Sequence, residues 1–176
     1  MLSRINIVAI VNAHLRTLRS LNQPATSKMI YWHDLATFFV LPAIIGYALY
    51  RLELDLLPQI PNLIAIISIF GGFLLNLLAI IYSYIDKLKI PTKDIIRKRF
   101  ASEINANISF CILLSVFVII LLLAYSFFPI NMWNHFVTYL KQVLEYTIYY
   151  MLMLFFLTLL MVLSRVFTLL QKESEG

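Results

Sequence analysis

The sequence has one cysteine, few charged residues and no motif typical of an enzyme active site. Cys111 is the only thiol, so neither a disulfide framework nor a clustered thiolate metal site forms within one chain. No nucleophile-base pair, HExxH motif, paired-carboxylate site or glycine-rich phosphate loop occurs. The histidines His14, His33 and His135 are far apart in the sequence, and we expect them at interfaces or in solvent. The sequence therefore predicts no enzyme, no metal site and no cofactor.

Hydrophobic residues take the place of the missing charges. They make up 61% of the 176 residues, against 13% charged residues, and the mean hydropathy is +0.86. The 24 residues from Asn62 to Ile85 carry no charge, and about 20 apolar residues suffice for a helix to cross a bilayer. These values predict a membrane protein.

The apolar runs and their breaks predict an all-α fold with four transmembrane helices. We place the spans at about 30–50, 62–85, 105–128 and 145–167. Together they form a transmembrane domain over residues 28–176. Residues 1–27 form an N-terminal amphipathic helix, over 2–22, and a linker. Ile7, Val8 and Val11 begin its apolar side, which either lies on the membrane surface or packs against another helix.

The basic residues predict the orientation. With four spans, both termini and the connection 86–104 share one side, which holds 12 of the 14 lysines and arginines, and the other side holds only Arg51 and Lys141. By the positive-inside rule, both termini and this connection are cytoplasmic.

Two helix faces are candidates for the lining of a pore. Small and polar residues recur every three or four positions in the second span: Ala65, Ser68, Gly72, Asn76, Ala79 and Ser83. This stripe favours either close packing between helices or a water-filled path, of which Ser68, Gly72, Asn76 and Ser83 are the candidate lining. The face of the last helix from Thr158 to Arg165 is the second candidate, with the same two interpretations.

The basic residues on the cytoplasmic side are candidates for binding an anion. They are Lys93, Arg97, Lys98 and Arg99 of the connection, helped by Arg16 and Arg19 of the N-terminal helix. Repeated around the axis of an oligomer, they form an electropositive vestibule that attracts a nucleotide or single-stranded nucleic acid. The alternative is that they only set the topology and contact anionic lipid.

Three classes of function remain. Four helices without deep charges are too few to enclose a channel alone, so a pore requires a ring of identical subunits. A non-conducting anchor or assembly subunit for a cytosolic partner is the alternative. A small transporter is the third, although Asp34 and Glu145 lie near span ends and not deep in a span.

Several segments carry a resemblance to a known family. These segments are VNAHLRTLRS, YWHDLATFFVLPAIIG, IFGGFLLNLLAIIYS and NISFCILLSVFVIILLL. They resemble small four-helix membrane proteins encoded near antiphage defence genes in prokaryotes. In outline the chain is similar to the Hailong-type channel, a DNA-gated homotetrameric effector with a basic vestibule. The resemblance implies a tetrameric ion channel in the prokaryotic inner membrane that depolarises the infected cell. It also implies gating by an anionic ligand, such as single-stranded DNA or a nucleotide, made by a partner enzyme.

Overall fold

The computed structural model is helical throughout the residues that it describes, which are 6–18, 32–52, 54–87, 95–127 and 135–174. The elements in chain order are α1 (Ile7–Thr17), α2 (Trp32–Arg51), a short 3-10 helix η2 (Leu57–Gln59), α3 (Ile60–Lys87), α4 (Ile95–Ser126) and α5 (His135–Ser174). No strand occurs in these ranges. The all-α prediction is confirmed for them.

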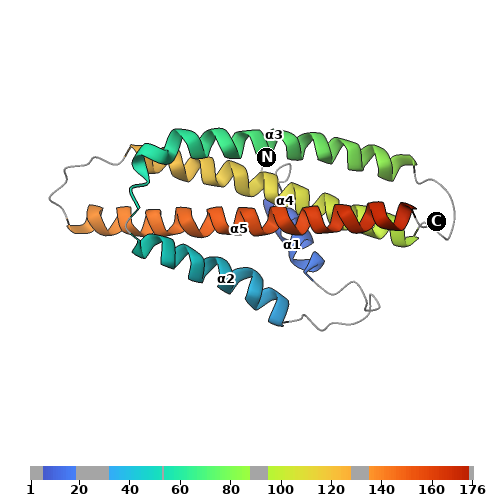
Figure 1. The fold of residues 1–176 in the computed structure, drawn as a ribbon, viewed down its shortest axis with the longest axis horizontal. Helices are drawn as coiled ribbons and strands as arrows, with labels where there is room; N and C mark the ends of the chain where they lie inside the picture. The colour runs from blue at the N-terminus through green and yellow to red at the C-terminus, as the bar shows by residue number, and fades with distance from the viewer. Residues whose placement is uncertain (1–5, 19–31, 53, 88–94, 128–134, 175–176) are drawn as a thin grey trace.

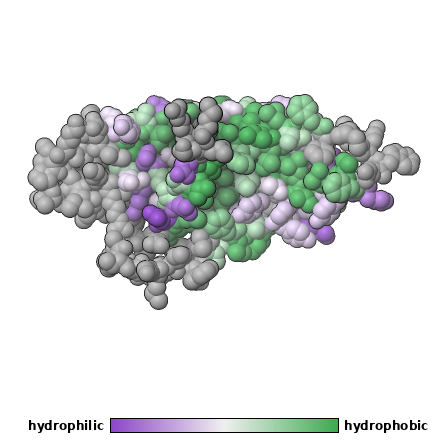
Figure 2. Space-filling model, turned by 180° about the vertical axis from the view of Figure 1, so that it is seen from behind, coloured by the Kyte–Doolittle hydropathy of each residue, from purple (hydrophilic) through white to green (hydrophobic). Residues whose placement is uncertain are grey.

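Three of the helices are long and apolar enough to cross a membrane. The candidate spans are Leu57–Ser83, Ala101–Ser126 and His135–Thr168, and a shorter apolar stretch covers Ala36–Arg51 of α2. In the view of Figure 2, hydrophobic residues dominate the middle of the surface and hydrophilic residues gather toward the ends. At 1.5 Å per residue, the 40 residues of α5 extend about 60 Å, against a hydrocarbon core of about 30 Å. A helix of this length crosses a bilayer only when it is strongly tilted or projects beyond it.

The long helices lie side by side in an open row. Helix α4 packs against both α3 and α5, and α5 packs against α2, so α3 and α2 are the two edges (Figure 1). Within the described ranges no extensive contact joins α2 to α3 or α2 to α4. A row of this kind leaves most of each edge helix exposed, and it encloses no channel.

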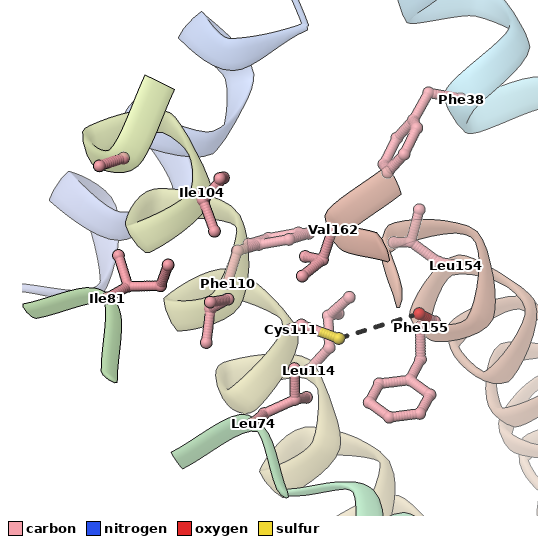
Figure 3. Close-up of a cluster of buried hydrophobic side chains, with 12 residues drawn as sticks. Phe38, Leu74, Ile81, Ile104, Phe110, Cys111, Leu114, Leu154, Phe155 and Val162 are labelled. Atoms are coloured by element: carbon pink, nitrogen blue, oxygen red, sulfur yellow. Dashed lines mark hydrogen bonds between the residues drawn. The ribbon is translucent and has the colours of Figure 1, made fainter. Parts of the chain in front are cut away.

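Helix α4 occupies the centre of the row and supplies much of the interior. Its apolar residues recur at helical spacing and are buried: Ala101, Ile104, Ile108, Val118 and Leu122. Asn107, Cys111 and Ser115 are also buried, because their spacing of four residues places them on the same side of the helix. In Figure 3 the Cys111 side chain points from α4 to α5, where its sulfur lies 3.9 Å from the carbonyl oxygen of Phe155.

A glycine brings α2 and α5 together. A β-carbon added to Gly46 of α2 would lie 3.0 Å from the backbone nitrogen of Tyr150 and 3.1 Å from its Cα atom. The backbones of the two helices therefore approach closely at this point, which requires a residue without a side chain. Pro42, one turn earlier in α2, is fully buried.

The helix ends gather the basic residues at one end of the row. Helix α3 ends, α4 begins and α5 ends there (Figure 1). We call it the basic end, because these stretches of helix include Lys87, Arg97, Lys98, Arg99 and Lys172. Arg51, at the end of α2, and Lys141, early in α5, belong to the opposite end. The segregation of basic residues expected from the sequence holds for the helices that the structure describes.

Helix α1 docks on the row through part of its predicted apolar side and through polar residues beside it. Of the predicted range 2–22, the helix covers Ile7–Thr17, and Asn6 caps its start by accepting a hydrogen bond from the Ala9 backbone nitrogen at 3.0 Å. On the predicted apolar side Val11 packs against the core, but Val8 is 68% exposed. His14 and Thr17 are also buried, because polar groups on α4 and α5 are their partners.

Candidate functional site

The predicted stripe on α3 faces away from the rest of the chain. All six residues of the stripe, Ala65, Ser68, Gly72, Asn76, Ala79 and Ser83, are exposed. A β-carbon added to Gly72 would meet no atom within 4 Å. The opposite face of α3 is the one that packs on the row, through the buried residues Ile67, Leu74 and Ile81. The stripe therefore packs against none of the other helices that the structure describes.

The stripe includes a polar group well inside the membrane-spanning stretch. Asn76 lies within Leu57–Ser83, and its side chain is exposed. A primary amide in hydrocarbon loses its hydrogen bonds with water, and such a transfer costs several kcal/mol when no partner replaces them. Either water or another protein surface must therefore cover this face of α3.

The second candidate face, on α5, points into the chain. The Thr158 side chain is fully buried, and its hydroxyl donates a hydrogen bond to the Leu154 carbonyl oxygen at 2.7 Å. The Arg165 guanidinium donates to the carboxylate of Glu103 on α4 at 2.5 Å, and it also donates to the backbone carbonyl oxygen of Thr17 on α1. These contacts leave the α3 stripe as the outward-facing candidate for a pore lining.

Of the predicted anion-binding residues, the side chain of Arg16 is the one that the structure describes. It is exposed on α1, on the side opposite the docked face. Arg97, Lys98 and Arg99 belong to the first turns of α4, but their side chains, together with all of Arg19 and Lys93, lie outside the described residues. The vestibule expected from these residues therefore stays a prediction.

A polar cluster holds α1 against the row. We call it the α1 junction, and its members are His14 and Thr17 of α1, Glu103 and Asn107 of α4, and Arg165 of α5. The Nδ1 atom of His14 lies 2.9 Å from the Oδ1 atom of Asn107. The Thr17 hydroxyl lies 2.6 Å from the same oxygen and 2.7 Å from the His14 carbonyl oxygen. One hydroxyl proton serves only one of these acceptors at a time.

The imidazole of His14 also fills a space between two aromatic rings. It stacks on Phe110 of α4 with ring centroids 3.9 Å apart, and it lies 5.3 Å from the ring of Phe38 of α2. Burial lowers the pKa of His14 to about 4, the positive charge of Arg165 also lowers it, and the hydrogen bond with Asn107 acts in the opposite direction. His14 is therefore neutral at physiological pH.

The α1 junction leaves two buried atoms unsatisfied. The Nε2 atom of His14 and the Nδ2 atom of Asn107 find no hydrogen-bond partner in the described part of the chain. Sequence reasoning missed this cluster, since it placed His14 at an interface or in solvent. The available signal was the spacing of His14 and Thr17, three residues apart and thus on one face of α1.

No group of three or more potential metal ligands occurs among the described residues. Comparison of the chain with protein-family models, with curated proteins and with solved structures finds no match.

Proposed function

We propose that several copies of this chain assemble around a shared axis into an ion-conducting pore, with the α3 stripe facing the water path. The observation that carries this proposal is the exposure of the stripe, with the Asn76 amide inside a membrane-spanning helix. Water in a pore satisfies an amide without a protein partner. A ring of copies also removes the exposed edge that the open row leaves at α3.

In this assembly all four long helices cross the membrane. Helix α2 has 20 residues, which rise about 30 Å and equal the thickness of the hydrocarbon core. Four crossings place both termini and the basic end on one side. We assign that side to the cytoplasm of a prokaryotic cell, because 12 of the 14 basic residues lie there.

The ligand of this pore is proposed to be a polyanion. Six basic residues of the connection 86–104, with Arg16 exposed on the nearby α1, would be repeated by every subunit around the axis. Repeated cations bind phosphate groups and release counterions, which suits single-stranded DNA or a nucleotide. The resemblance to Hailong-type effectors supports four subunits and a role in antiphage defence.

A non-conducting assembly subunit is the alternative. The same exposed stripe would then pack against a helix of a different membrane protein, since small residues let helix backbones approach and Asn76 would find a partner amide or hydroxyl. The two functions differ in one property: only the pore places water beside Asn76.

Conductance of the purified protein in planar bilayers tests the pore. We expect current that responds to a single-stranded DNA of 20 nucleotides, and we expect Asn76→Asp to increase selectivity for cations, because it adds a negative charge to the lining. The matched control is Leu75→Asp, one residue away on a different face, which places a charge against lipid and is expected to reduce insertion instead. Absence of current with and without this DNA supports the assembly subunit, and uptake driven by a proton gradient supports the transporter.

A further inference from the structure

The contact between α1 and the row differs from the contacts between the spanning helices. The interior between α4 and α5 is apolar and includes the fully buried residues Ile108, Cys111 and Phe155 (Figure 3). Helix α1 packs Ile10, Val11 and Leu18 against the same apolar cluster, but it also carries the polar α1 junction, with its two unsatisfied buried atoms. Permanent contacts have apolar centres, and polar contacts are typical of surfaces that also exist apart.

The groups of the α1 junction also tolerate water. If α1 leaves, the Arg165 guanidinium keeps its ion pair with Glu103, at 2.5 Å, and loses only the Thr17 carbonyl oxygen. On the undocked helix, His14 and Thr17 gain water as donor and acceptor, including the Nε2 atom of His14, which lacks a partner in the docked arrangement, whereas Asn107 stays near the start of the candidate span Ala101–Ser126. Undocking therefore frees the unsatisfied His14 ring nitrogen for water, loses the apolar contacts of α1, and does not require α4 to separate from α5.

Docked α1 joins two helices that otherwise have no extensive contact. The His14 ring touches Phe110 of α4 on one side and faces Phe38 of α2 on the other. Helix α2 otherwise packs against α5 alone among the long helices, for the residues that the structure describes. The His14 ring therefore links α2 to α4, two helices that have no extensive contact of their own in the described ranges.

We propose that α1 is a detachable latch, which fixes α2 relative to α4 when docked and undocks as one unit while the row of long helices stays folded. Arg165 of α5 stabilises the docked position, because its guanidinium donates a hydrogen bond to the Thr17 carbonyl oxygen at the C-terminal end of α1. Any effect of the latch on pore opening rests on the proposed function. The docking and undocking of α1 do not depend on that function.

Thiol labelling in lipid nanodiscs, where both membrane faces are open to solvent, tests the latch. Three positions report on different events. A cysteine at Val11, which packs against the interior, reports undocking of α1, and one at the exposed Val8 gives the reference rate. The native Cys111, buried between α4 and α5, reports opening of the row. A maleimide reagent modifies each position, and mass spectrometry of the peptides separates them.

We expect Arg165→Gln to speed labelling of Val11→Cys by about tenfold, since loss of one hydrogen bond from a charged group changes an equilibrium by at least this factor. Labelling of Cys111 should stay at its slow rate, and Val8→Cys should not change. Thr17→Val, which removes the hydroxyl from the other side of the contact, should act in the same direction. The latch is overturned if Cys111 becomes reactive together with position 11, or if position 11 stays protected in both variants. Neither result involves current, so a failure of the latch is distinguishable from a failure of the pore.

Discussion

The imidazole ring of His14 lies parallel to the phenyl ring of Phe110 to within 9°, at a centroid separation of 3.9 Å. This stack joins α1, which is separate from the three candidate spans, to the central helix of the row. It places a titratable group among aromatic rings, where only the neutral form is well accommodated. The position of α1 thereby depends on the protonation of one residue.

Docking of α1 should weaken as the pH falls. The pKa of docked His14 is about 4, against an ordinary value of 6.5, so the undocked form binds the proton more readily. The stabilisation is complete above pH 6.5 and is lost as the pH falls toward 4, by about 3 kcal/mol in total. The undocked fraction should rise about tenfold per pH unit in this window.

The ratio of labelling rates at Val11→Cys and Val8→Cys, followed from pH 8 to pH 4.5, measures this effect, since the ratio cancels the intrinsic pH dependence of the thiol. The charged groups of the α1 junction that accompany His14 are the guanidinium of Arg165 and the carboxylate of Glu103, which form an ion pair. The control is His14→Gln, which has no titratable ring and should show no pH dependence between 6.5 and 5. Identical profiles for the two proteins would refute the role of His14.

Replacing Gly46 with alanine should separate α2 from α5. The new methyl group would lie 3.0 Å from a backbone nitrogen of α5, which cannot rotate away, and overpacking of this kind costs about 1–3 kcal/mol. Gly72→Ala on α3 is the matched control, since no atom lies within 4 Å of its new methyl group. Unfolding of the two variants in mixed detergent measures the difference, and equal stability would contradict the close contact of α2 with α5.

The ion pair between Glu103 and Arg165 should show strong coupling. Their side chains are only 16% and 12% exposed, and removal of one partner from a largely buried pair is more costly than removal of both. We expect Glu103→Gln and Arg165→Gln each to destabilise the chain, and the double variant to lose about 2 kcal/mol less than the sum. A double-mutant cycle from unfolding curves provides the value. Simple additivity would mean that the two side chains act independently.

The sequence predicted the long helices well because their signals are local. Uncharged runs mark α3 and the later part of α4, and the absence of proline and glycine from 136 to 172 marks α5. Asn107, Cys111 and Ser115 follow one another at intervals of four residues, so they share one face of α4, and the structure places this face in the interior. These patterns span a few helical turns, so they can be recognised in the sequence without knowing which helices pack together.

The contacts of α1 were not predictable in the same way. Arg165 belongs to a face that the sequence offers as a candidate pore lining, but its carboxylate partner Glu103 lies 62 positions away, and Asn107 lies 93 positions from His14. Helical periodicity describes which residues share a face, but it does not identify what the face meets. The stripe of α3 shows the same limit, since its spacing fitted packing and pore lining equally well until its exposure was known.

The most direct test of the account compares neighbouring residues of α3 that differ only in face. Gly72 and Phe73 lie at the same depth and are both exposed, as are Ala79 and Ile80, but only Gly72 and Ala79 belong to the stripe. Each is replaced by cysteine, and modification by a charged methanethiosulfonate reagent is measured in nanodiscs, with buried Cys111 as the background. A thiol in hydrocarbon rarely ionises and therefore reacts slowly. We predict that Gly72→Cys and Ala79→Cys react about tenfold or more faster than Phe73→Cys and Ile80→Cys, and equal, slow reaction within both pairs would contradict a water-filled path along α3.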